Sequence, residues 1–342
     1  MSKGKVILAM SGGVDSSVSV VMLQEAGYEV EGLTMCLGDF SVVEKAAESA
    51  DHFGIKHHWV DLTEDFDRDV KSYFVEEYKN GRTPNPCVIC NKKVKLGKLF
   101  QYAETLGFDY FATGHYANIR EIDGRFAVAR AEYLPKDQSY VLYSLSQSVL
   151  SRLIFPLGGM CKEEVREKGR SLGLAAAQQK DSQDICFIPD GDYRRFLLER
   201  GLRNLPGNFV LKNGTVVGTH KGIANYTIGQ RKGLGLAMGY PVFVTAIRPE
   251  KNEVEIGLEA DLLSKKMLIK DCNYQLVENL TEPVELDIKI RYKSPAVRGV
   301  VAPLPDGMAE VTFANPEKAV TPGQSAVFYD GDTVFGGGTI IK

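Results

Sequence analysis

The sequence of 342 residues lacks the features of a secreted or membrane-spanning protein. No apolar run approaches the roughly 20 residues that cross a bilayer. The start MSKGKVILAM has no long apolar region or signal-peptide cleavage site. Six cysteines are too few for a disulfide scaffold in a chain of this length. We therefore expect a cytoplasmic protein without a membrane partner, in which paired cysteines serve catalysis, redox chemistry or metal binding.

An excess of positive charge is also missing, because the formal net charge is −3. This value argues against a simple basic nucleic-acid binder, but it hides the distribution of charge along the chain. Lysine and arginine cluster at 92–98, 194–203, 231–232 and 291–298. Each cluster alone is typical of a solvated surface. Together they are compatible with a polyanionic partner.

Residues 1–196 alternate short apolar runs with helical patterns, which is typical of an α/β domain with a parallel sheet. The strands are expected at 5–10, 29–35, 57–62 and 108–114. The helices are expected at 15–27, 41–54, 64–79 and 93–106. Ser41 is the expected cap of the second helix, and Gly27 and Gly54 end the first two. A hairpin at 120–130 turns on Asp123-Gly124.

Internal repeats and low-complexity linkers are absent from the rest of the chain. After about residue 200 turn residues become dense and helical periodicity fades. From about residue 265 only short strands are expected, as in a small β-barrel or sandwich. We therefore predict a catalytic α/β domain at 1–196, a small β-rich central domain at 197–264 and a second β-rich domain at 265–342.

The first strand leads into SGGVDSS, residues 11–17, and then into a helix. Gly12 and Gly13 let backbone N–H groups turn towards an anion, and the helix N-terminus adds the positive end of its dipole. Three serine hydroxyls can donate to phosphate oxygens, those of Ser11, Ser16 and Ser17. The loop is neither GxxxxGK[ST] nor GxGxxG. A tight strand-to-helix turn with serine caps is the ordinary explanation. The motif resembles the PP-loop of ATP pyrophosphatases, which cut ATP between the α- and β-phosphates and adenylate a substrate.

Two cysteines stand close together in PNPCVICN, residues 84–91. Lys92 and Lys93 follow Cys87 and Cys90, and we expect them to lower the pKa of a nearby thiol. Cys186, in KDSQDICFIP, is a third candidate. The remaining cysteines are expected to be small buried side chains; they are Cys36, Cys161 and Cys272.

A structural zinc site is disfavoured because the single CxxC has no partner pair. A thioredoxin-like pair should begin a helix soon after a strand, whereas this one follows TPNP. Three uses of sulfur remain: attack of a thiolate on an activated carbon, a persulfide carrier, or three cysteines that hold an iron–sulfur cluster.

Six motifs in order along the chain are similar to those of the bacterial tRNA-specific 2-thiouridylases: SGGVDSS, GRTPNPCVICN, ATGHYA, LPKDQSYVLY, DSQDICFIP and YTIGQRKGLG. The resemblance covers essentially the whole chain. It implies an N-terminal PP-loop domain of the adenine-nucleotide alpha hydrolase type, a central domain that contacts tRNA and a C-terminal tRNA-binding β-barrel. It also implies 2-thiolation of the wobble uridine in the tRNA anticodon loop with ATP and Mg²⁺, giving 2-thiouridine, AMP and pyrophosphate.

The resemblance also implies roles for single residues. Those that bind ATP would be Ala9, Met10, Ser11, Gly12, Gly13, Val14, Asp15, Ser16, Met35 and Gly114. Cys90 would be the nucleophile and Cys186 the persulfide carrier, and the two would pass through a disulfide. The uridine pocket would be formed by Asn85, Pro86 and Cys87. Further tRNA contacts would come from His115, Lys136, Asp137, Gln138, Arg291, Tyr292 and Gln324. Without the resemblance, each has an ordinary structural explanation, such as core packing for Met35 or a helix cap for Asp137.

One position departs from the family pattern, because Cys87 stands where an acidic residue is usual. The chain thus offers three thiols, Cys87, Cys90 and Cys186, that could ligate a [4Fe–4S] cluster and leave one iron open for sulfide. A persulfide route would need a sulfurtransferase or cysteine desulfurase relay, whereas a cluster route could use free sulfide. The three thiols favour the cluster slightly. Two rival functions are another PP-loop adenylating enzyme and a non-catalytic RNA-binding protein.

Overall fold

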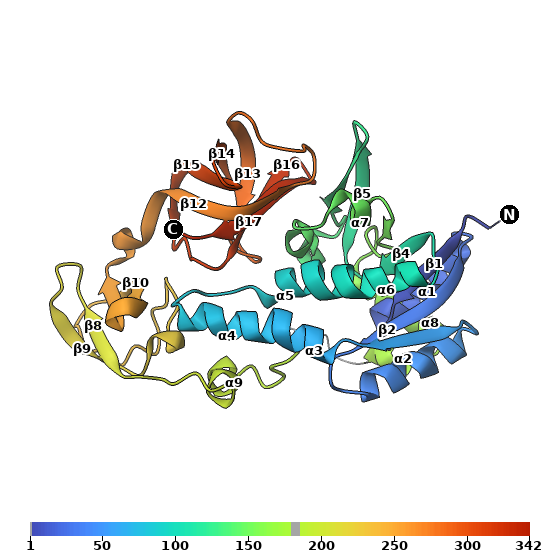
Figure 1. Ribbon diagram of the computed structural model, residues 1–342, viewed down its shortest axis with the longest axis horizontal. Helices are drawn as coiled ribbons and strands as arrows, with labels where there is room; N and C mark the ends of the chain where they lie inside the picture. Colours follow the sequence, from blue (N-terminus) through green and yellow to red (C-terminus); the bar gives the residue numbers. More distant parts are fainter. Residues whose placement is uncertain (1, 179–184) are drawn as a thin grey trace.

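The computed structural model describes residues 2–178 and 185–342 of the chain. Figure 1 shows three parts: a sheet with helices at the N-terminal end, a small sheet in the middle of the sequence and a barrel at the C-terminal end. Cys186 lies among the described residues, while the first four residues of DSQDICFIP lie outside them. No described helix is long and apolar enough to cross a bilayer.

The N-terminal part is built on a five-stranded parallel sheet with the strand order β3-β2-β1-β4-β7. Its strands are β1 (Lys5–Ala9), β2 (Glu29–Cys36), β3 (His57–Asp61), β4 (Tyr110–Thr113) and β7 (Leu153–Ile154). After Lys5 the central strand β1 is apolar because both faces are covered, and Val6, Ile7 and Leu8 are fully buried. The helices α1 (Val14–Glu25) and α2 (Ser41–His52) pack against this sheet, and α8 (Lys162–Ser171) packs on α1. The predicted α/β class is confirmed.

The first two helices end just before the predicted glycines. Gly27 and Gly54 have φ of 91° and 65°, as is typical of a glycine that follows a helix. The expected cap at the start of α2 was wrong. Ser41 is the first helical residue, and the Asp39 carboxylate accepts its N–H at 3.0 Å. Either residue type suits a helix start, so the sequence alone did not choose between them.

Two long helical rods lie side by side in Figure 1, and each contains a π-helical stretch. The first rod is α3 (Thr63–Phe66), η1 (Asp67–Lys71) and α4 (Ser72–Lys79). The second is α5 (Pro86–Ile89), η2 (Cys90–Lys98) and α6 (Leu99–Thr105). The second rod begins at Pro86 instead of residue 93, because proline suits a first helical position and the Asn85 side chain caps it. Both cysteines of the CxxC therefore lie on the helix, not before it.

The predicted hairpin consists of β5 (Ala117–Ile122) and β6 (Arg125–Arg130). Asp123 and Gly124 both have positive φ, 50° and 75°, as a two-residue turn with right-handed strand twist requires. The hairpin does not join the N-terminal sheet. Its strand β6 instead pairs with β17 of the C-terminal barrel, Ala129 opposite Thr333.

The central part, which follows α9 (Tyr193–Glu199), is a four-stranded sheet with the order β10-β11-β8-β9. Its strands are β8 (Gly207–Val210), β9 (Val216–His220), β10 (Phe243–Arg248) and β11 (Glu253–Gly257). Phe209, Val244 and Val254 are fully buried and form its core. The predicted β-rich central domain is confirmed as a fold, whereas its exact borders stay a prediction.

The C-terminal part is a closed barrel, because β12 pairs with both β15 and β17. Its strands are β12 (Leu263–Tyr274), β13 (Val284–Lys289), β14 (Val297–Leu304), β15 (Met308–Lys318), β16 (Ser325–Asp330) and β17 (Thr333–Ile340). Strands alone were expected from about residue 265, and this is confirmed. The sequence of the long strand β12 gives little strand signal, because its lysines and exposed positions interrupt the apolar alternation, and its pairing shifts register twice. Closure removes the unpaired edges that an open sheet of this size would leave.

Candidate functional site

The phosphate loop lies where neighbouring parallel strands end. Ala9 ends β1 and Gly114 follows β4 directly. A Cβ atom on Gly12, which has φ of 71°, would lie 2.8 Å from the Lys45 carbonyl carbon, so only glycine fits. A Cβ atom on Gly114 would lie 3.3 Å from the Asp15 carbonyl carbon. Met35, near the end of β2, packs against the main core. Ligands of open α/β sheets bind at such an edge.

The side chains of the loop divide into those that face inward and those that face solvent. Met10 and Val14 are buried. Ser16 Oγ donates to the Gly13 carbonyl at 3.0 Å and accepts the Ser11 N–H at 3.3 Å. Ser17 is buried and bonded to the Gly13 carbonyl and to Ser49 Oγ, at 3.0 and 2.7 Å. Ser16 and Ser17 are thus both buried and bonded within the protein, whereas Ser11 is exposed; donation from these hydroxyls to phosphate stays a prediction.

The Asp15 carboxylate has two partners that the sequence did not reveal. Lys162 Nζ lies 2.7 and 2.8 Å from its two oxygens, and the Tyr116 hydroxyl donates to it at 2.8 Å. Lys162 is buried although it begins an otherwise charged helix, KEEVREKGRS. Nothing in that pattern predicts that its first residue faces the phosphate loop.

Cys87, Cys90 and Cys186 come from two segments of the chain and influence one another's ionisation. Asn85 Oδ1 accepts the Cys87 N–H at 3.2 Å, which holds the start of α5. Cys90 is half-buried, whereas Cys87 and Cys186 are exposed, and all six cysteines of the chain are free thiols. The structure thus brings together the three cysteines that the sequence singled out.

Burial raises the pKa of Cys90 to about 11. The side chains of Cys87 and Cys186 reach solvent, but the protein atoms around each thiol displace enough water to raise its pKa as well. Lys95 opposes the effect of burial at each of the three thiols. The expectation that Lys92 and Lys93 lower the pKa was wrong. The two lysines are exposed, and the Lys93 amine lies 3.7 Å from the Asp69 carboxylate. Free thiols, not thiolates, are therefore the resting state near neutral pH.

The expected iron–sulfur site has no structural support. Among residues 2–178 and 185–342, no group of three or more histidine, cysteine, aspartate or glutamate side chains is arranged to hold a metal ion. Cys87, Cys90 and Cys186 influence one another's ionisation, but they are not among such groups in the described part of the chain.

The candidate tRNA residues that follow β4 are mostly engaged within the protein. His115 is buried and its Nδ1 lies 2.7 Å from Thr113 Oγ1. Burial holds its pKa well below the usual value, with a smaller contribution from Lys95. Gln138 Oε1 accepts the Tyr116 N–H at 2.9 Å, and Asp137 accepts the N–H groups of Ala131 and Ser139. Lys136, at the end of a short 3₁₀ turn, is half-buried.

The candidate residues of the barrel reach back to loops of the N-terminal part. The Tyr292 hydroxyl donates to the Asp137 carbonyl at 3.0 Å, and Gln324 Nε2 donates to the Thr83 carbonyl at 2.8 Å. Arg291 is exposed and donates to the Lys318 carbonyl at 2.6 Å. Tyr292 also lies close enough to Cys87 for the thiol to affect its ionisation. Two of these three residues therefore connect the barrel to the N-terminal part.

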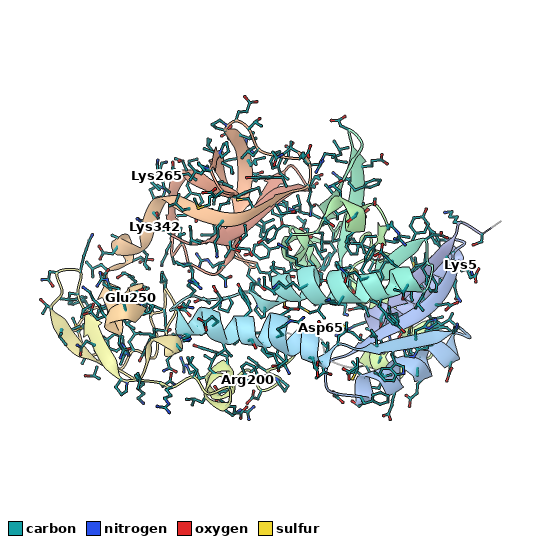
Figure 2. All side chains as sticks on the ribbon, in the orientation of Figure 1. Lys5, Asp65, Arg200, Glu250, Lys265 and Lys342 are labelled. Carbon is teal, nitrogen blue, oxygen red and sulfur yellow. The ribbon has the colours of Figure 1, made fainter. Side chains whose placement is uncertain are left out.

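The basic clusters of the sequence are partly neutralised by internal ion pairs. Arg200, labelled in Figure 2 below the helical rods, donates from Nη1 to the Asp67 carboxylate at 3.0 Å and ties the end of α9 to the first rod. Arg195 pairs with Asp190 at 3.0 Å. Arg298 pairs with acidic residues of β13, at 3.3 and 3.5 Å. For these arginines the ordinary surface explanation holds.

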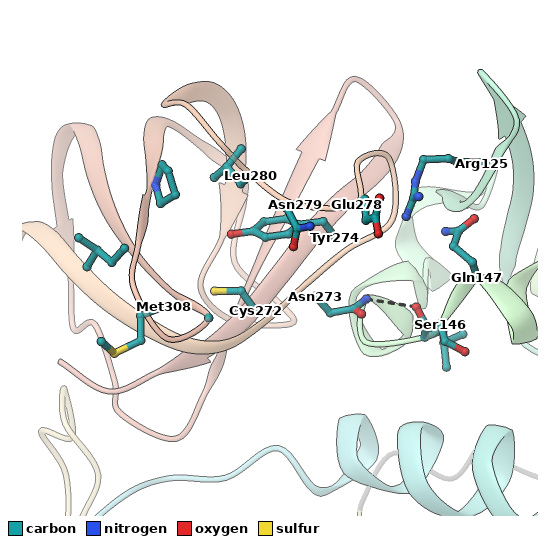
Figure 3. A pocket seen from close by; sticks show the side chains of 14 residues that line it. Arg125, Ser146, Gln147, Cys272, Asn273, Tyr274, Glu278, Asn279, Leu280 and Met308 are labelled. Atoms are coloured by element: carbon teal, nitrogen blue, oxygen red, sulfur yellow. Dashed lines mark hydrogen bonds between the residues drawn. The ribbon is translucent and has the colours of Figure 1, made fainter.

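A hollow of about 390 Å³ opens between the barrel and the loops around α7 (Gln147–Leu150). Figure 3 shows Cys272 and Tyr274 of the barrel facing Gln147 and Arg125 across it. The Gln147 side chain forms hydrogen bonds with the backbone of Phe126 and Gln275. The Cys272 thiol forms a hydrogen bond with the Tyr274 side chain. None of the residues that line it is a candidate for the phosphate loop or the thiol site.

Family models match three consecutive stretches of the chain. A tRNA methyl transferase HUP domain matches residues 4–190, a tRNA methyl transferase PRC-barrel domain residues 194–258, and an aminomethyltransferase beta-barrel domain residues 264–340. The N-terminal part is therefore a HUP domain with a PP-loop, followed by two small β-rich domains.

Relatives match the chain over nearly its full length. A tRNA-specific 2-thiouridylase of Clostridium perfringens is 44% identical over 355 residues, 99% of each chain. That of Carboxydothermus hydrogenoformans is 46% identical over 360 residues, 100% of this chain and 99% of its own. That of Heliobacterium modesticaldum is 45% identical over 358 residues, 99% of this chain and 93% of its own. The chain belongs to the tRNA-specific 2-thiouridylase family.

Proposed function

We propose that this enzyme adenylates the 2-oxygen of the wobble uridine in tRNA and replaces that oxygen with sulfur from a Cys186 persulfide. The observation that carries the proposal is the proximity of two sites. Gly114 contacts Asp15 of the phosphate loop, and the next residue, His115, interacts with Lys95. Lys95 in turn acts on all three thiols. This proximity supports a reaction in which adenylation and sulfur transfer occur at adjoining sites.

The phosphate loop would serve the first step. The backbone N–H groups around Gly12 and Gly13 and the N-terminus of α1 would hold the phosphates of ATP. The uridine 2-oxygen attacks the α-phosphorus, and the bond to pyrophosphate breaks. Mg²⁺, which binds through carboxylates and phosphates, would find its protein oxygen in Asp15. Lys162 and Tyr116 orient that carboxylate.

The thiols would serve the second step. The terminal sulfur of the Cys186 persulfide attacks carbon 2, and AMP leaves with its oxygen. Cys90 then gives up its proton, attacks the inner sulfur and breaks the sulfur–sulfur bond, which leaves 2-thiouridine and a Cys90–Cys186 disulfide. A thiol reductant restores the two cysteines, and a sulfurtransferase or cysteine desulfurase relay reloads Cys186. A persulfide needs two neighbouring thiols but no metal-holding group, which agrees with the arrangement described above.

The RNA would approach the exposed side of the thiol site. Asn85, Pro86 and Cys87 would receive the uridine, which costs least to unstack in a single-stranded loop. Lys136 and Arg291 would contact backbone phosphates, so binding should weaken as salt rises.

The test is a reaction of the purified chain with ATP, Mg²⁺, an unmodified tRNA transcript and a persulfide donor, read by mass spectrometry of the nucleosides. We expect 2-thiouridine, with AMP and pyrophosphate in equal amounts. Cys90→Ala and Cys186→Ala should abolish it, whereas Cys272→Ala, a half-buried barrel cysteine, should not. Full activity of either of the first two variants would contradict the mechanism. Product without added persulfide, but with iron and sulfide, would favour the cluster route.

A further inference from the structure

The segment 81–85, which leads into the cysteine helix, is held by both of the other domains. On the side of the central domain, a Cβ atom on Gly81 would lie 2.7 Å from Ile247 Cγ2 and 3.0 Å from Pro249 Cγ. Thr83 Oγ1 lies 3.4 Å from Thr227 Oγ1. Backbone and central domain are therefore in direct contact at this point.

The barrel binds the same segment through its backbone. The Thr83 N–H donates to the Pro322 carbonyl at 2.9 Å, and Gln324 Nε2 donates to the Thr83 carbonyl at 2.8 Å. Both main-chain polar groups of Thr83 are thus satisfied by the turn 322–324 between β15 and β16. Because both hydrogen bonds are made to the same residue, they fix which residue of the segment faces the turn as well as how far the segment lies from the turn.

Gly323 makes this contact possible. Its φ is 92°, and a Cβ atom there would lie 2.9 Å from the Thr83 nitrogen and 3.0 Å from Arg82 Cβ. The backbones of the barrel and the segment touch without an intervening side chain. Any larger residue at 323 must push the two apart.

The cysteine helix begins only a few residues further on. Pro84 and Pro86 are buried, and proline fixes φ at each. Asn85 between them caps the helix through the Cys87 N–H. This stretch has little freedom to absorb a displacement, so a shift at Thr83 is passed on to Cys87 and Cys90.

We propose that Gly323 and Gln324 are positioning residues for the cysteine helix: the barrel turn 322–324 determines where Cys87 and Cys90 lie. Gln324 then acts on the reaction through Thr83, within the protein, and not only through tRNA. The catalytic part of this inference rests on the proposed function, whereas the position of the thiols can be measured without it.

The decisive experiment compares Gly323→Ala with Gly331→Ala. Both glycines lie in turns of the barrel and have positive φ, but no described atom lies within 4 Å of a Cβ on Gly331. Both variants place a β-carbon at a positive φ, which is less favourable at 92° than at 56°, and only Gly323→Ala brings that carbon against Thr83. Gln324→Glu, described below, changes the contact with Thr83 without any change of backbone strain. We expect Gly323→Ala to lower kcat for 2-thiolation by about tenfold or more, since small displacements of reacting groups are costly. The Kd for tRNA should change less than about twofold, because the turn is engaged within the protein.

A second readout is the rate of alkylation of Cys90 by iodoacetamide in the absence of ATP and tRNA. This rate should change in Gly323→Ala and stay at the wild-type value in Gly331→Ala. Gln324→Glu, which is isosteric but cannot donate to the Thr83 carbonyl, should change it in the same direction, and Gln324→Asn should restore part of it. Gln324→Glu also decides the matter if Gly323→Ala does not fold.

An unchanged kcat and an unchanged alkylation rate in Gly323→Ala and Gln324→Glu would overturn the proposal. So would a weaker Kd for tRNA that accounts for the whole loss of activity, because Gln324 would then be an RNA contact only. A wild-type protein that makes no 2-thiouridine, while the alkylation rates still differ as stated, would refute the proposed function and leave the positioning role standing.

Discussion

The phosphate loop and the cysteine segment are built in opposite ways. The loop follows directly from its own sequence: a buried strand, two glycines and a helix bring Gly12, Gly13 and Asp15 to the edge of one sheet. The cysteine segment depends on residues far away in the chain. Thr83, in the segment that leads into the cysteine helix, is hydrogen-bonded to the barrel and contacts the central domain. The phosphate loop is therefore formed within one domain, whereas the segment that leads into the cysteine helix contacts both of the other domains.

The difference suits the two tasks. Binding phosphates needs fixed backbone N–H groups, which a strand, a turn and a helix supply locally. Sulfur transfer has to occur only when a large RNA lies correctly against the enzyme. A thiol helix that is held by the domains proposed to contact RNA is suited to that condition.

The largest effect is expected where the loop has no room to adapt. In Gly12→Ala the new Cβ would lie 2.8 Å from the Lys45 carbonyl carbon at a φ of 71°. We expect kcat/KM for ATP to fall by about 100-fold, because the backbone N–H groups are displaced from the phosphates. The measurement is tRNA-dependent release of pyrophosphate.

Gly54→Ala is the matched control for that prediction, since Gly54 has φ of 65° and no described atom within 4 Å. The alkylation rate of Cys90 should be unchanged in both variants. A changed rate in Gly12→Ala alone would show that the two sites are not independent.

The next effect concerns the stability of the phosphate loop. Lys162 is buried and the Asp15 side chain is 33% exposed, so Lys162→Met breaks a partly buried ion pair, and the free energy of unfolding should fall by about 2 kcal/mol. Lys168→Met on the same helix breaks an exposed pair with Glu25 and should cost about 0.5 kcal/mol or less. Urea denaturation measures both. Equal losses would mean that burial of Lys162 does not matter.

A smaller effect is expected in the cysteine helix. A Cβ atom on Gly97 would lie 2.8 Å from the Lys92 carbonyl oxygen within the π-helical stretch. Gly97→Ala should therefore change the backbone around Cys90 and lower the rate of 2-thiolation by about tenfold. Binding of ATP should be unaffected. Lys98→Ala, at the exposed end of the same stretch, is the control, and identical behaviour of the two variants would contradict the prediction.

The smallest effect is a dependence of stability on pH at His115, which lies between the two sites. Its pKa is held well below 6.5 by burial, so the unfolded chain takes up a proton first as the pH falls. Above about pH 6.5 the ionisation of His115 therefore does not change the free energy of unfolding. As the pH falls below that value, proton uptake by the unfolded chain lowers the free energy of unfolding. Between about pH 7.5 and 5.5 the wild type should lose about 1 kcal/mol more than His115→Gln. Parallel loss in both proteins would mean that other groups, such as His57 and His220, account for the change.

Local patterns predicted much of this molecule correctly. The first strand, its glycine turn and α1 were expected, as was the turn at Asp123-Gly124, because neighbouring residues decide such conformations. The start of the cysteine helix was misplaced. Pro86 and Asn85 are good helix-start residues, but TPNP reads equally well as a loop.

The sequence by itself determined the parallel sheet, the phosphate loop at its edge and the identity of the three thiols, because each depends on residues adjacent in the chain. Only the tertiary structure decided that Lys95 acts on the thiols and that Lys162 forms an ion pair with Asp15. It also decided that the barrel closes and forms hydrogen bonds with Thr83. These contacts join residues that are tens to hundreds of positions apart. Their energies come from burial and from backbone groups meeting across domains, which no local pattern encodes.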